Sequence, residues 1–142
     1  MTNAAARAEY EAAICKQLAS AEIVRFKEVL LGDWRPTTSH CHENVDTWLR
    51  ATPGHCHVRG WVYLKQHYDG STVVWELTAH SVVRDEKGNL FDITPIRDGN
   101  TPIQENDERK KLCMRFVGHI GDEELFWRYK NANPSIYCPT CQ

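Results

Sequence analysis

The spacing of apolar residues near the N-terminus is helical. Six apolar side chains recur mostly every three to five positions among Ala, Glu, Lys and Arg: Tyr10, Ile14, Leu18, Ile23, Phe26 and Leu30. This period predicts an amphipathic helix over residues 4–31, which can break near Ser20. A second helix is predicted over Cys41–Ala51, because acidic residues occupy its early turns and Pro53 follows its end.

Beyond residue 57 the apolar pattern becomes alternating. Val58–Gln66 and Ser71–Arg84 are rich in Val, Trp, Tyr and Thr, and they flank the turn sequence Tyr68-Asp69-Gly70. This pattern is typical of two antiparallel strands joined as a hairpin. A third strand is expected over Asn89–Thr94.

The last third of the chain mixes connections with short elements. Pro95–Lys111 is polar and contains Pro and Gly, which predicts a long surface connection. Leu112–Val117 favours a fourth strand, and residues 122–130 favour a short helix capped by Asp122. Residues 131–142 are expected to form a loop-like tail.

Together these elements predict an α+β fold in which N-terminal helices pack on a small antiparallel sheet. A length of 142 residues fits a single domain, 1–142. We expect an N-terminal helical part (1–35), a core that carries the candidate chemistry (36–96), and a C-terminal strand, helix and tail (97–142).

Charge and hydropathy exclude some classes of protein. Seventeen basic and nineteen acidic residues leave a net charge of -2, so no basic excess is present to bind nucleic acid. No apolar run approaches the length of a membrane span, and no secretory signal pattern is visible at the N-terminus. We therefore expect a cytoplasmic protein, in which cysteines serve catalysis, metal binding or the core rather than disulfides.

The candidate chemistry comes from six Cys and seven His residues. Cys41 starts a predicted helix, where unpaired N–H groups and the helix dipole favour a thiolate. Its own N–H is a candidate for half of an oxyanion hole. His80 is a polar residue in the middle of a predicted strand. A three-residue loop at 86–88 would pair Val82 with Asp92 and place Asp92 diagonal to His80 on the same sheet face.

Cys41, His80 and Asp92 together supply a nucleophile, a general base and a carboxylate that orients the base. His42 and Asn44 are further candidates for lining the pocket or donating to an oxyanion, although His42 also fits a helix surface. The same three residues allow a structural interpretation, with Cys41 as a buried thiol, His80 as a core histidine and Asp92 as a turn cap.

The order of these residues resembles the papain-like cysteine hydrolase and acyltransferase superfamily, in its transglutaminase-like and NlpC-type branches. The resemblance rests on Cys41, on Ala79-His80-Ser-Val-Val83 and on Gly88-Asn-Leu-Phe-Asp92-Ile-Thr-Pro95, and it covers about residues 36–96. The block from Cys41 to Pro95 also resembles a group of bacterial domains with no assigned function. The resemblance implies a thiol-dependent hydrolase or acyltransferase that acts on an amide or peptide bond of a substrate without a cofactor.

The C-terminal sequence offers an alternative. Cys138 and Cys141 have the spacing of half a zinc-ribbon site, but no second Cys-x-x-Cys completes it. A zinc-binding structural or protein-interaction module is therefore the alternative to the enzyme hypothesis. A non-catalytic binding module is a further alternative, because a fold does not determine a function.

Overall fold

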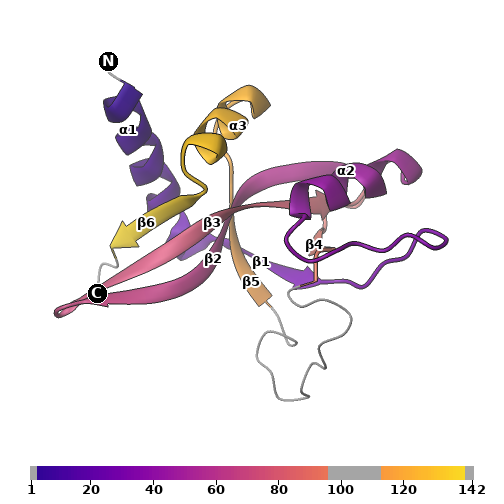
Figure 1. Ribbon diagram of the computed structural model, residues 1–142, viewed down its shortest axis with the longest axis horizontal. Coiled ribbons are helices and arrows are strands. Elements are labelled where there is room, and N and C mark those ends of the chain that lie inside the picture. Colours follow the sequence, from indigo (N-terminus) through magenta and orange to yellow (C-terminus); the bar gives the residue numbers. More distant parts are fainter. Residues whose placement is uncertain (1–2, 96–112, 140–142) are drawn as a thin grey trace. The chain divides into compact units, whose positions relative to one another are not determined.

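The computed structural model describes residues 3–95 and 113–139 of the chain (Figure 1). Within these ranges the protein is α+β, as predicted, with three α-helices and a six-stranded mixed sheet. The helices are α1 (Asn3–Lys16), α2 (Cys41–Ala51) and α3 (Glu123–Ala132), with a short 3₁₀ helix η1 (Leu18–Ser20). The strands are β1 (Glu22–Phe26), β2 (Cys56–Asp69), β3 (Thr72–Arg84), β4 (Leu90–Asp92), β5 (Cys113–Gly118) and β6 (Ser135–Pro139).

The strand order is β2-β5-β1-β4-β3-β6, and β2 also pairs with β3. The contacts of the chain fall into two compact units, each built from separate segments. The first unit comprises Met1–Glu22, Arg59–Ala79 and Arg115–Gln142, and the second comprises Ile23–Val58 and His80–Met114.

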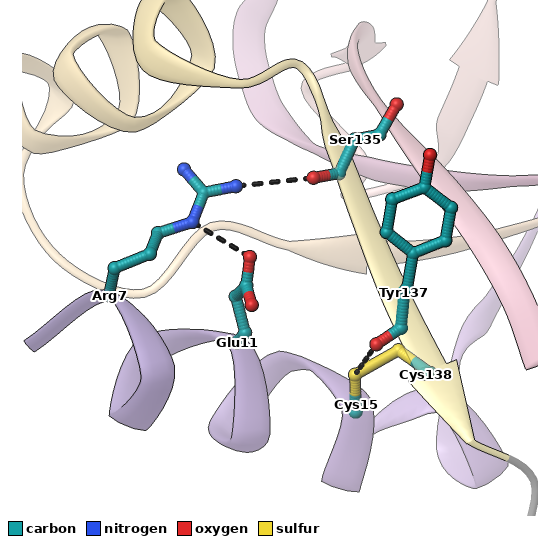
Figure 2. The surroundings of a disulfide bond; sticks show 6 residues. All are labelled: Arg7, Glu11, Cys15, Ser135, Tyr137 and Cys138. Carbon is teal, nitrogen blue, oxygen red and sulfur yellow. Dashed lines mark hydrogen bonds and ion pairs between the residues drawn. A yellow bond between two sulfur atoms is a disulfide. The ribbon is translucent and has the colours of Figure 1, made fainter. Parts of the chain in front are cut away.

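In the first unit, helix α1 supplies two buried residues, Tyr10 and Ile14, to an apolar core. Fully buried side chains from the strands and from α3 complete this core: Trp61, Leu77, Phe126 and Ile136. A disulfide between Cys15 of α1 and Cys138 of β6 joins the two elements covalently (Figure 2). This crosslink corrects the expectation that the cysteines form no disulfides.

Arg7 reinforces the same connection between α1 and the C-terminal segment. Its guanidinium donates to the main-chain oxygens of Tyr129 and Asn133 at 2.7 and 3.2 Å. It also donates to the main-chain oxygen of Ser135 at 3.2 Å and to the Glu11 carboxylate at 2.9 Å (Figure 2). Arg7 thereby links α1 to the C-terminal end of α3, where a basic side chain is favoured, and to the first residue of β6.

The second unit contains the predicted hairpin in its predicted register. Val83 pairs with Phe91, Arg84 pairs with Leu90, and the main chain of Asp85 donates to that of Asn89 at 3.0 Å. Apolar side chains from this hairpin and from the preceding segments form a separate core with α2: Val29, Val45, Val83, Phe91 and Ile93, with Trp48 and Leu49 packed against them.

Two parts of the prediction are wrong. Residues 22–26 form strand β1 rather than helix, and β1 pairs in parallel with β4, so the sheet is mixed rather than antiparallel. Val24 alone is buried in this strand, and the β-branched pair Ile23 and Val24 suits a strand better than a helix. The predicted tail contains β6, which pairs antiparallel with Val74–Thr78 of β3.

The other elements agree with the prediction. Helix α3 begins after Asp122, whose side chain accepts a hydrogen bond from the main chain of Leu125 at 2.9 Å. The expected connection over 95–111 lies almost entirely outside the described residues. None of the helices in the described part of the chain has the length and apolar character needed to cross a membrane.

Candidate active site

Cys41 is the first residue of helix α2, as predicted. The first N–H groups of a helix have no acceptor within the helix, so those at the start of α2 are directed toward whatever binds there. The loop before Cys41 is strained. Ser39 has a positive φ of 68°, although it is not glycine, and the buried hydroxyl of Thr38 has no hydrogen-bond partner among the described residues. Strain of this kind concentrates at functional sites.

His80 and Asp92 meet as the hairpin register predicts. His80 Nε2 lies 2.9 Å from Asp92 Oδ2, and the side chains are 13% and 1% exposed. The other carboxylate oxygen, Oδ1, accepts a hydrogen bond from the main chain of Thr94 at 3.0 Å. Asp92 is thereby held in place, and it holds the His80 ring in one orientation, with Nδ1 left for another partner.

That partner is the Cys41 thiol, which shares a hydrogen bond with His80. Burial opposes ionisation of the thiol, but hydrogen bonds with His42 and His80 outweigh burial and lower the pKa of Cys41 to about 6. Burial also opposes the imidazolium, but the charge and hydrogen bond of Asp92 outweigh it and raise the pKa of His80 to about 10. Between these values the pair exists as thiolate and imidazolium.

His42 brings a second imidazole to the same sulfur. It is the second residue of α2, it is hydrogen-bonded to the Cys41 thiol, and its Nδ1 lies 2.5 Å from the hydroxyl of Ser81. Ser81 is fully buried, and it was not among the site residues expected from the sequence. The one feature of the sequence that points to Ser81 is its hydroxyl, which directly follows the candidate His80 in a strand expected to be buried.

The side-chain amide of Asn44 makes its hydrogen bonds within the protein. Its amide oxygen accepts from the main chain of Thr37 at 3.1 Å, and its amide nitrogen donates to Thr37 O at 2.8 Å and to the Thr94 hydroxyl at 3.0 Å. Both amide protons are therefore used within the protein. Asn44 thus connects α2 to the preceding loop and to Thr94. Because the main chain of Thr94 donates to Asp92, these bonds help to hold Cys41 and Asp92 at a constant distance.

The disulfide removes one of the two alternative metal ligands. The Cys138 sulfur is bonded to Cys15, so it offers no thiolate to a metal, and Cys141 lies outside the described residues. Within residues 3–95 and 113–139, no three His, Cys, Asp or Glu side chains are grouped so as to hold a metal ion. A second free thiol, Cys56, is exposed, and its sulfur lies 3.8 Å from the main-chain oxygen of Arg84.

Of the residues that sequence analysis assigned to chemistry, the structure brings Cys41, His80 and Asp92 into one hydrogen-bonded series and adds His42 to it. Comparison with known proteins finds no family model, no curated protein and no solved structure that matches the chain.

Proposed function

We propose that the chain is a thiol-dependent acyl-transfer enzyme that acts on an amide or peptide bond, with Cys41 as nucleophile, His80 as general acid and base, and Asp92 as the residue that orients His80. One observation carries the proposal. The Cys41 thiol is hydrogen-bonded to an imidazole whose other nitrogen contacts a buried carboxylate. A papain-like core, on the pattern of its transglutaminase-like and NlpC-type branches, is part of this proposal.

The reaction follows from the charges of the pair. The Cys41 thiolate attacks the carbonyl carbon, a carbon–sulfur bond forms, and the N–H groups at the start of α2 stabilise the oxyanion. The His80 imidazolium then protonates the leaving nitrogen as the carbon–nitrogen bond breaks, which leaves a thioester on Cys41 and releases an amine. Water adds to the thioester, the carbon–sulfur bond breaks, and a carboxylic acid leaves. An amine in place of water would give transamidation by the same route.

An activated ester tests the thiol without knowledge of the natural substrate. We expect p-nitrophenyl acetate to give a burst of one p-nitrophenolate per chain, as the acetyl group moves to Cys41, followed by slower turnover. Cys41→Ala should abolish the burst. Cys56→Ala is the matched control, because Cys56 is the other described free thiol and is exposed, and it should leave the burst unchanged.

The same experiment can reject the proposal. A wild-type protein that gives no burst, or a Cys41→Ala variant that keeps the burst while remaining folded, would mean that Cys41 is not the nucleophile. Peptide mass spectrometry of the acid-quenched wild-type protein locates the acetyl group, which should be found on Cys41 and not on Cys56.

A further inference from the structure

We infer that a ring N–H of His42 is the side-chain half of the oxyanion hole, and that Ser81 is the positioning residue that holds this N–H in place. The inference rests on the proposed function and assigns a further catalytic residue to the same site. The main-chain N–H groups at the start of α2 supply the other half. His42 donates a hydrogen bond throughout the reaction and transfers no proton.

His42 directs an N–H at the nucleophile. It follows Cys41 in α2 and is hydrogen-bonded to the Cys41 sulfur, and this contact lowers the pKa of the thiol. A hydrogen bond has this effect on a thiol only when the partner donates to the thiolate. The imidazole is therefore a donor at the sulfur, whereas the amide of Asn44, the other side chain considered for the oxyanion, donates to Thr37 and Thr94.

Ser81 fixes the ring of His42. Its hydroxyl lies 2.5 Å from Nδ1, and it is fully buried in strand β3. In a neutral ring that donates to the sulfur, the Ser81 hydroxyl donates to Nδ1 and the ring proton is on Nε2, whereas a protonated ring carries a proton on both nitrogens. The ring has an N–H in either form, so the role of His42 does not depend on its charge.

Acylation moves negative charge from the sulfur to a neighbouring oxygen. As the Cys41 thiolate adds to the carbonyl carbon, the carbon–sulfur bond forms and the π electrons of the carbonyl pass to its oxygen, which is two bonds from the sulfur. An N–H held at the sulfur is thus close to the new oxyanion. Sulfur is the weaker acceptor, so the hydrogen bond from His42 strengthens as the transition state forms. When the carbonyl re-forms, the carbon–nitrogen bond breaks and His80 protonates the amine.

Two reactions of Cys41 distinguish an oxyanion donor from a residue that only favours the thiolate. p-Nitrophenyl acetate forms an oxyanion as it acylates the sulfur, whereas iodoacetamide is attacked at a saturated carbon and forms none. Both reagents react with the thiolate, so the ratio of the acylation rate to the alkylation rate at one pH cancels the fraction of thiolate. We expect His42→Phe to lower this ratio by about 100-fold, the scale of losing one oxyanion donor.

Three further variants sharpen the test. The amide of His42→Gln can also donate, so this variant should keep the ratio within about tenfold of wild type. Ser81→Ala keeps the N–H without its support and should lower the ratio by about tenfold, because the donor loses its orientation. His67→Gln is the control and should leave the ratio unchanged, because it replaces an imidazole that contacts Glu76 outside this site.

An unchanged ratio in His42→Phe would overturn the inference, because His42 would then act only on the fraction of thiolate. If this variant fails to fold, an unchanged ratio in Ser81→Ala overturns it instead. The proposed function fails separately, because it requires the wild-type protein to give a burst at Cys41.

Discussion

Each compact unit contains a histidine paired with a buried carboxylate, and the pairs differ in the order of their contacts. In the first unit, Glu76 binds His67 through one carboxylate oxygen at 2.5 Å and accepts from the Ser135 hydroxyl through the other at 3.1 Å. In the second unit, Asp92 binds His80, and His80 binds Cys41.

The difference shows what makes a set of residues reactive. Ser135, Glu76 and His67 are the residue types of a hydrolase triad, but the carboxylate lies between the hydroxyl and the imidazole, so the base cannot reach the hydroxyl proton. His67 is also 41% exposed at its side chain and contacts the Tyr137 ring. The histidine of the first unit therefore makes a structural contact, whereas the imidazole of the second unit lies between its carboxylate and a nucleophile.

The sharpest test of this comparison replaces each histidine in turn. His80→Gln should lower the rate of the acetylation burst by about 1,000-fold, because it removes the cation that pairs with the thiolate and the general acid. His67→Gln should leave the rate within a factor of two. Rapid-mixing measurements with p-nitrophenyl acetate give both rates, and comparable losses in the two variants would remove the distinction between the pairs.

The disulfide should affect the stability of the fold without affecting the chemistry of Cys41. Reduction of Cys15–Cys138 should lower the free energy of unfolding by about 2–4 kcal/mol, because it frees a long loop of the unfolded chain. Urea denaturation with and without dithiothreitol measures this loss. The double variant Cys15→Ala, Cys138→Ala is the control and should not respond to the reductant. Alkylation of both sulfurs before any reduction would contradict the crosslink.

Glu76→Gln should cost about 1–3 kcal/mol of stability, the contribution of hydrogen bonds to a charged group, while the acetylation burst remains. Burial alone would raise the pKa of Glu76, but hydrogen bonds with His67 and Ser135 outweigh it and lower the pKa. A lowered pKa stabilises the fold above the ordinary value of 4.5, and this contribution is lost as the pH falls below it. The difference from wild type in urea should therefore shrink in acid.

A matched substitution separates this effect from a general loss of charge. Glu124 is 85% exposed and lies 3.7 Å from Arg128, so Glu124→Gln should change the stability by less than about 0.5 kcal/mol at any pH. A loss in this variant as large as that of Glu76→Gln would show that the buried contacts of Glu76 contribute nothing specific.

The smallest expected effect is that of pH on the alkylation rate of Cys41 in the wild-type protein. With a Cys41 pKa of about 6, lowering the pH from 8 to 6 should only halve the rate of Cys41 alkylation by iodoacetamide. A cysteine in an unstructured peptide, with a pKa near 8.5, should slow by about 70-fold over the same range. Peptide mass spectrometry follows Cys41 by itself, and a slowing as large as that of the peptide would contradict the thiolate.

The sequence predicted those parts of the site that local chemistry determines. The start of α2 at Cys41 follows from flanking loop residues and acidic early turns, and the contact of His80 with Asp92 follows from one hairpin whose turn contains Gly88. Gly88 adopts a φ of 87°, which glycine permits at little cost. The length of a hairpin turn determines the register of its two strands, so the predicted pairing of these strands agrees with the observed one.

The missed parts depend on partners that are distant in sequence. Strand β1 has helix-like apolar spacing, and its pairing with β4 some sixty-five residues later decides its conformation. The Cys15–Cys138 disulfide joins residues 123 positions apart, and spacing alone cannot identify such a pair. The contact of His42 with Ser81 depends on how α2 packs on β3, which is a property of the folded unit rather than of either segment.

The disulfide also gives the chain the connectivity of a ring. The main chain from Cys15 to Cys138 is closed on itself by two side chains, so a protease that cuts one peptide bond inside this ring opens the ring without releasing a fragment. The nicked molecule keeps the intact mass plus one water under non-reducing conditions and separates into two pieces only after reduction. Cys41, His80 and Asp92 all lie within the ring, so a single cut leaves the three residues in one covalent molecule.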